Sequence, residues 1–157
     1  MRGLKGGMAA CVAVAALCDL DVRGLVTVGP KADPAVVGAQ PAHVRVERYV
    51  PQTRVLPHCD VVVSHGGSGT VLATLALGLP QVCLPQGADQ FLNAAAIAAA
   101  GVGISLMPGE ADPDAVRDAI VRVLDDASFR EAAGRVRSSI ASMPSPDDVA
   151  EGLDALP

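Results

Sequence analysis

The hydrophobic positions of this chain fall into short apolar runs separated by longer stretches with helical spacing. Five runs are rich in Val, Leu and Ile and end at Gly, Pro or polar residues, which is typical of strands. The run at 60–64 is β-branched at each of its inner positions, 61–63, as expected of a strand that is buried on both faces of a sheet. The five runs occupy residues 22–28, 44–46, 60–64, 81–84 and 102–106.

Helical stretches lie before, between and after these runs. Residues 68–77 and 89–100 are rich in Ala and Leu, and we interpret the apolar stretch within residues 4–19 as a helix that packs on the sheet. The alternation of strands and helices predicts an α/β fold with a Rossmann-like parallel sheet and helices on both faces. No run precedes the first helix, so we expect a sheet that lacks one strand.

The last third of the chain is expected to be a helical C-terminal tail without chemistry of its own. Asp112 precedes a proline and is a candidate N-cap. Ser128 with Glu131 has the spacing of a capping box, and Ser145 begins a third helix that runs to about residue 156. We expect the 157 residues to form a single domain. The apolar faces of the first two tail helices consist of Val116, Ile120, Val123 and Leu124, and of Phe129, Ala133, Val136 and Ile140.

Composition and charge narrow the classes of function. Half of the residues are hydrophobic but only 2% are aromatic, so the core is expected to be aliphatic. The net charge is −5 and the basic residues are scattered, which gives no basis for binding nucleic acid or an anionic membrane. The apolar N-terminal stretch is shorter than the ~20 residues of a membrane span. The four cysteines lack C-x-x-C spacing, so we expect reduced thiols, no zinc site and a cytoplasmic location.

The segment richest in candidate chemistry follows the predicted strand 60–64. Residues 65–70 read His-Gly-Gly-Ser-Gly-Thr and lead directly into a predicted helix. Glycines let a ligand approach the backbone, and the free N–H groups of a helix N-terminus attract anions. The hydroxyls of Ser68 and Thr70 and the imidazole of His65 add further donors. No Walker lysine or G-x-G-x-x-G pattern is present, so the alternatives are a different anion site and a glycine-rich turn with a packed histidine.

A polar pair follows the next predicted strand. Asp89 and Gln90 come shortly after residues 81–84, and parallel strands present their carboxyl ends at one edge of a sheet. We therefore expect the pair to lie beside the glycine loop, where a carboxylate and an amide can bind vicinal hydroxyls. The alternatives are a simple N-cap for Asp89 and a solvated first-turn residue for Gln90. A phosphate site next to a hydroxyl-binding pair suits a sugar nucleotide.

With these motifs in view, residues 47–103 resemble the donor-binding region of bacterial natural-product glycosyltransferases of glycosyltransferase family 1, which have the GT-B fold. The resemblance implies that the chain is the C-terminal, donor-binding half of such an enzyme. The motifs that carry it are Tyr-Val-Pro-Gln at 49–52, Val-Leu-Pro-His-Cys-Asp at 55–60, the loop at 65–70, Pro-Gln-Gly-Ala-Asp-Gln at 85–90, and Asn93.

The resemblance also implies a role for each site residue. The related plant motif has Trp at the position of Tyr49 and a ribose-binding Glu in the helix after the glycines. Residues 71–76 contain no carboxylate, which favours thymidine over uridine nucleotides. For Tyr49 the alternative is a core residue at a strand end. The implied ligand groups are the diphosphate for His65, Gly67, Ser68, Gly69 and Thr70, the sugar for Asp89 and Gln90, and the nucleoside for Tyr49, Val50 and Gln52.

The reaction that the resemblance implies is an inverting, metal-independent transfer from a dTDP- or UDP-sugar to a hydroxyl of a natural product. Residues 142–149 also resemble the end of enzymes that glycosylate polyketides. The acceptor site and the general base belong in the family to an N-terminal domain that this chain lacks. We therefore expect no catalytic residue here, His43 and His58 included, no cofactor, and no activity of the fragment alone. Its expected partners are the donor, a small-molecule acceptor through the N-terminal domain, and a second copy in a homodimer.

Two alternatives remain open from the sequence. One is a non-catalytic nucleotide-sugar-binding module that regulates or escorts a partner. The other is a fragment of a nucleotide-sugar epimerase with the GT-B fold, which carries further catalytic carboxylates and histidines that are not evident here.

Overall fold

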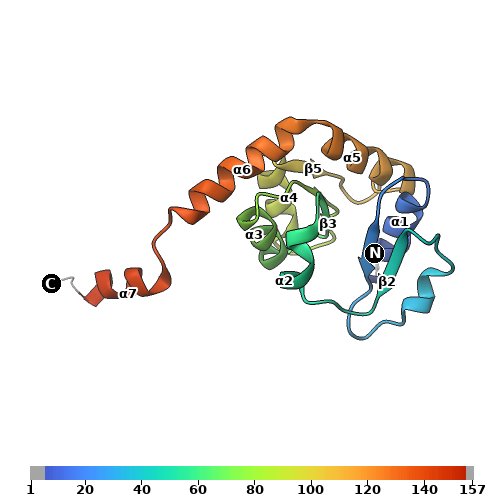
Figure 1. Ribbon diagram of the computed structural model, residues 1–157, viewed down its shortest axis with the longest axis horizontal. Coiled ribbons are helices and arrows are strands. Elements are labelled where there is room, and N and C mark those ends of the chain that lie inside the picture. Colours follow the sequence, from blue (N-terminus) through green and yellow to red (C-terminus); the bar gives the residue numbers. More distant parts are fainter. Residues whose placement is uncertain (1–5, 155–157) are drawn as a thin grey trace.

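The strands of the computed structural model, which describes residues 6–154, are parallel and flanked by helices (Figure 1). All five predicted strands are present, and the predicted parallel α/β fold is confirmed. The strands are β1 (Gly24–Thr27), β2 (Val44–Glu47), β3 (Val62–Ser64), β4 (Gln81–Cys83) and β5 (Gly103–Ser105).

The helices also follow the predicted order. The ends of the first and last predicted helices, at residues 4–5 and 155–156, lie outside the described residues. Within those residues no helix is both long enough and apolar enough to cross a membrane. The helices are α1 (Gly6–Cys18), α2 (Gln52–Val55), α3 (Ser68–Ala76), α4 (Gln90–Ala99), α5 (Pro113–Asp125), α6 (Ala127–Ala141) and α7 (Pro146–Asp154), with 3-10 turns η1 (Pro34–Val37) and η2 (Leu56–His58).

The strands form two separate sheets. One has the order β1-β2 and the other β3-β4-β5. β4 is buried throughout, whereas β3 is only half-buried. The prediction that residues 60–64 form a fully buried strand is therefore wrong: helices cover both faces of the sheet, but within residues 6–154 no strand pairs with the outer edge of β3. The expectation of a sheet that lacks one strand stays a prediction.

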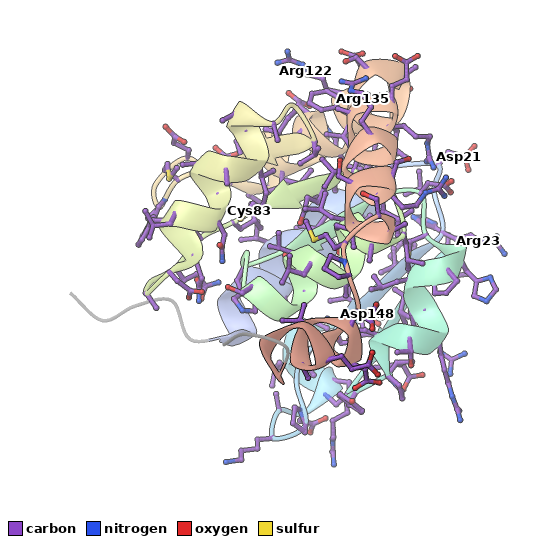
Figure 2. All side chains as sticks on the ribbon, turned by 90° about the vertical axis from the view of Figure 1, so that its left-hand side faces the viewer. Asp21, Arg23, Cys83, Arg122, Arg135 and Asp148 are labelled. Atoms are coloured by element: carbon purple, nitrogen blue, oxygen red, sulfur yellow. The ribbon has the colours of Figure 1, made fainter. Side chains whose placement is uncertain are left out.

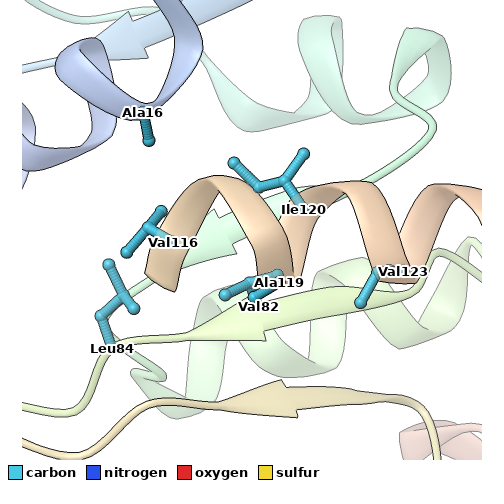
Figure 3. Close-up of a cluster of buried hydrophobic side chains, with 7 residues drawn as sticks. All are labelled: Ala16, Val82, Leu84, Val116, Ala119, Ile120 and Val123. Atoms are coloured by element: carbon cyan, nitrogen blue, oxygen red, sulfur yellow. The ribbon is translucent and has the colours of Figure 1, made fainter. Parts of the chain in front are cut away.

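Helices α1 and α5 join the two sheets through a shared core. Figure 3 shows Ala16 of α1 above the apolar face of α5, which in turn covers Val82 and Leu84. The predicted inner face of α5 is confirmed, since Val116, Ile120 and Val123 are buried. On the opposite side of the second sheet, Cys83 lies in the interior among side chains of α3, α4 and α6 (Figure 2). The second sheet is thus covered by helices on both faces.

The helix starts of the C-terminal tail were predicted with one error. Asp112 caps α5 by accepting from the backbone N–H of Ala115 at 2.8 Å. Ser145 caps α7, accepting from the N–H of Asp148 at 3.1 Å. The predicted capping box at Ser128 is wrong, because α6 begins at Ala127 and is capped by Asp126, which places Ser128 inside the first turn. Helix α6 leads away from the body, and α7 lies clear of it (Figure 1).

Candidate functional site

The candidate site lies where β3 and β4 end. These strands pair in parallel register, Ser64 opposite Cys83, so the loops that follow them meet at one edge of the sheet. Gly66 has φ +80° and is buried, and a Cβ at this position would overlap Cys83 Sγ. The glycine loop therefore packs directly on β4, and the start of α3 is held at the carboxyl edge of the sheet.

His65 lies across the beginning of α3. Its side chain is exposed, and its Nε2 would be 2.8 Å from a Cβ placed on Gly67. Gly67 is the N-cap of α3 and carries no side chain to cap the helix, while Gly69 has open space around it. The first N–H groups of a helix have no partner within the helix. The imidazole and the N–H groups that open α3 thus form a cradle with the partial positive charge that suits an anion.

Asp89 forms the second wall of the site. Although it occupies the N-cap position of α4, its side chain does not cap that helix. Instead its Oδ2 accepts from the hydroxyl of Ser68 at 2.7 Å. That hydrogen bond is the main reason why the pKa of Asp89 is lowered, with a smaller contribution from the nearby charge of His65. The interpretation of Asp89 as a simple N-cap is therefore wrong.

Gln90 is half-buried rather than solvated, so that alternative is also wrong. Its Oε1 accepts from the backbone N–H of Gln86 at 2.8 Å and of Gly87 at 3.2 Å. This pair of bonds holds the loop between β4 and α4. Ala88 in the same loop has φ +53°, the only positive φ outside glycine among residues 6–154. Backbone strain of this kind is concentrated at functional sites.

The segment predicted to bind the nucleoside, residues 49–52, contacts the first turn of α3 through Gln52. Its Nε2 donates to Thr70 Oγ1 at 2.9 Å, which ties the start of α2 to the first turn of α3. Tyr49 is 65% exposed, so the interpretation as a core residue is wrong and the ring is free at the surface. Val50 is half-buried beside it. The other two histidines lie elsewhere: His58 is exposed in η2, and His43 Nε2 is bonded to the carbonyl of Leu17 at 3.1 Å.

Asn93 is a residue of the site for which the sequence suggested no role. Its Nδ2 donates to the carbonyl of Gly66 at 2.8 Å and to Ser68 Oγ at 3.1 Å, and lies 3.4 Å from Asp89 Oδ2. The sequence signal that could have indicated its contact with the site is its position one helical turn after Asp89. The structure therefore brings the three predicted segments together, with Asn93 among them.

Comparison with known proteins points to one family. The family model described as "Erythromycin biosynthesis protein CIII-like, C-terminal domain" matches residues 12–156. The 10-deoxymethynolide desosaminyltransferase of Streptomyces venezuelae is 38% identical over 141 residues, which is 90% of this chain and 33% of that protein. The chain thus spans about a third of the length of this relative.

Solved structures show the same relationship. The calicheamicin glycosyltransferase CalG4 matches with a TM-score of 0.85 and 28% identity, over 99% of this chain and 40% of that one. The spinosyn rhamnosyltransferase SpnG complexed with thymidine diphosphate matches with a TM-score of 0.84 and 36% identity, over 93% and 40%. The fold is that of the C-terminal domain of GT-B glycosyltransferases, and the chain belongs to the family of erythromycin biosynthesis protein CIII-like C-terminal domains.

Proposed function

We propose that this chain is the donor-binding domain of a glycosyltransferase that uses a dTDP- or UDP-sugar. The observation that carries the proposal is the meeting of three segments at the N-terminus of α3, joined by the Gln52–Thr70 and Ser68–Asp89 hydrogen bonds. A helix N-terminus suits a diphosphate, and the flanking segments offer groups for a nucleoside and a sugar. A related structure complexed with thymidine diphosphate supports the same choice of ligand.

In this proposal each wall of the site binds one part of the donor. His65, the backbone N–H groups of residues 67–70 and the hydroxyl of Thr70 bind the diphosphate, while the hydroxyl of Ser68 is donated to Asp89. The carboxylate of Asp89 and the Nε2 of Gln90 bind sugar hydroxyls, because the Oε1 of Gln90 is already engaged with its own loop. The exposed ring of Tyr49, the backbone of Val50 and the side chain of Gln52 lie against the nucleoside.

The proposed reaction is an inverting transfer. The oxygen of an acceptor hydroxyl attacks the anomeric carbon and loses its proton to a base, while the bond from that carbon to the diphosphate oxygen breaks. The electron pair of the broken bond stays on the nucleoside diphosphate, and the transition state resembles an oxocarbenium ion. The cradle at α3 stabilises the leaving group, because its dipoles are already oriented toward the developing negative charge. We propose a hydroxyl of a polyketide-type natural product as the acceptor.

We propose that this transfer needs no metal ion. Two Asp-x-Asp triplets occur, at residues 19–21 and 112–114, but neither belongs to the loops of the cradle. Residues 6–154 contain no group of three or more His, Cys, Asp or Glu side chains placed to hold a metal. The helix N-terminus and His65 supply positive potential at the diphosphate instead.

Catalysis is proposed to require an N-terminal, acceptor-binding domain that contributes the general base. The chain spans 33% of the Streptomyces venezuelae relative, and the outer edges of β1 and β3 lack a strand within residues 6–154. The unpaired edge of a sheet offers N–H and C=O groups to a further strand. We favour the pairing with an N-terminal domain over a homodimer of the chain. We place the resulting enzyme in the cytoplasm.

The proposal is tested by calorimetric titration of the chain with dTDP, UDP and thymidine. We expect weak binding of dTDP, and no binding of either diphosphate at millimolar concentration would refute the donor site. His65→Ala should lower dTDP affinity roughly ten- to a hundredfold, since a charge-assisted contact contributes about 1.5–3 kcal/mol, and leave thymidine affinity nearly unchanged. His58→Ala, an exposed histidine outside the cradle, is the matched control. Equal loss of dTDP and thymidine binding in His65→Ala would mean that His65 is structural.

A further inference from the structure

Asn93 occupies the point where the two walls of the site touch. It lies in the first turn of α4, half-buried, and its Nδ2 faces acceptors from both loops. The two strongest contacts are to the carbonyl of Gly66 at 2.8 Å and to Ser68 Oγ at 3.1 Å. Residues 66 and 93 are separated by 27 positions in the chain, so this contact exists only in the folded protein.

The bond to Gly66 fixes the orientation of one peptide group. In a trans peptide the C=O and the following N–H point in opposite directions. When the carbonyl of Gly66 is held toward Asn93 of α4, the N–H of Gly67 is therefore held pointing away from Asn93. Gly66 has no side chain that could anchor it, and a larger residue does not fit, since a Cβ there would overlap Cys83 Sγ. Two other side chains restrain it: Ser64 Oγ accepts from the N–H of Gly66 at 3.1 Å, and Asn93 holds its carbonyl.

The bond to Ser68 orients a hydroxyl that is shared by both walls. Ser68 Oγ accepts from Asn93 and donates to Asp89 Oδ2 at 2.7 Å. With its acceptor side facing Asn93, the hydroxyl hydrogen is directed at the carboxylate. One amide group thus sets the direction of both the Gly67 N–H and the Asp89 carboxylate.

We infer that Asn93 is a positioning residue, which aligns the anion cradle of α3 with the sugar-binding carboxylate of Asp89 without touching the donor itself. This inference rests on the proposed function of the site. It adds a requirement to that function: a side chain from the first turn of α4, together with the Ser68–Asp89 bond, holds the diphosphate and sugar walls in register.

The test compares Asn93→Ala and Asn93→Asp with Ser105→Ala. Ser105 is a matched control, because its hydroxyl donates at 2.8 Å to the backbone carbonyl of Ala94 in α4, away from the cradle. Three quantities are measured for each variant: the amide ¹H–¹⁵N chemical shifts of Gly67 and Ser68, the affinities for dTDP and thymidine, and the thermal unfolding midpoint.

For Asn93→Ala we expect displaced amide resonances of Gly67 and Ser68 and about a tenfold loss of dTDP affinity, as for a lost hydrogen bond to an aligned group. Thymidine affinity and the unfolding midpoint should match those of Ser105→Ala. For Asn93→Asp the loss of dTDP affinity should be larger, because a carboxylate replaces the donor beside both Gly66 and Asp89.

Two results would overturn the inference. One is unmoved Gly67 and Ser68 resonances in Asn93→Ala, and the other is an equal loss of dTDP and thymidine binding together with a lower unfolding midpoint, which indicates a purely structural role. If the native chain binds neither dTDP nor UDP, the proposed function fails separately. The amide shifts then still decide the role of Asn93, with inorganic pyrophosphate as the probe of the cradle.

Discussion

Two strand-to-strand connections in this molecule begin alike and end differently. β1 and β3 are both followed by a glycine with positive φ, Gly29 at +96° and Gly66 at +80°. After Gly29 the chain forms only the four-residue turn η1 before β2, whereas after Gly66 it forms the nine-residue helix α3 before β4. Only the second connection therefore presents the free N–H groups of an α-helix at the edge of its sheet.

The surroundings of the two glycines differ as well. A Cβ on Gly29 would meet nothing within 4 Å, while one on Gly66 would overlap Cys83 Sγ. The loop at Gly66 is also bonded to the next connection through Asn93, and the loop at Gly29 has no comparable partner among residues 6–154. A glycine turn after a parallel strand is thus not sufficient for a binding site. Packing against the neighbouring strand and hydrogen bonds from the neighbouring loop distinguish the second connection.

The largest expected effect is that of alanine at the two glycines. Gly66→Ala combines a left-handed backbone with overlap in a packed core, so we expect the free energy of unfolding to fall by roughly 2–4 kcal/mol. Gly29→Ala has the backbone cost alone, about 1 kcal/mol. Urea denaturation monitored by circular dichroism measures both. Equal losses would show that the packing beneath Gly66 contributes nothing to the difference between the two connections.

A second prediction concerns the thiol beneath Gly66. Burial raises the pKa of Cys83 to about 11, and only the thiolate reacts with alkylating reagents. At pH 8 about one part in a thousand of such a thiol is ionised, so Cys83 should label far more slowly than the exposed Cys11, and faster as the pH rises toward its pKa. Mass spectrometry after iodoacetamide treatment resolves the two sites. Labelling of Cys83 at the rate of Cys11 in the native chain would contradict a closed packing of the loop on β4.

The smallest expected effect is that of removing the Gln52–Thr70 hydrogen bond, which is exposed to solvent. Gln52→Ala should lower the affinity for thymidine and for dTDP by the same factor, about two- to fivefold, because one hydrogen bond contributes about 0.5–1 kcal/mol. Gln40→Ala is the control from the first connection, where the Gln40 side chain donates to the carbonyl of Gly38. A loss of dTDP affinity alone would place Gln52 at the diphosphate instead of the nucleoside.

Elements that depend on local pattern were predictable from the sequence. Apolar runs indicated all five strands, and helical spacing indicated the buried face of α5, because backbone geometry directly relates periodicity to exposure. The error at Ser128 arose because two neighbouring residues are both common N-caps, and the helix begins at Ala127, directly after Asp126. The half-buried state of β3 could not be read from its apolar sequence, since burial of a strand depends on whether a neighbour is present.

The sequence by itself determined the order of strands and helices, and it placed the glycine loop and the pair Asp89 and Gln90 at the ends of two predicted neighbouring strands. Only the tertiary structure decided which groups bond to which. Ser68 meets Asp89 and Asn93 meets Gly66 across 21 and 27 positions of the chain. Such contacts depend on the separation of two loops, which the pairing of β3 with β4 sets, and no local periodicity encodes that distance. For the same reason the need for glycine at position 66 follows from the thiol of Cys83 beneath it.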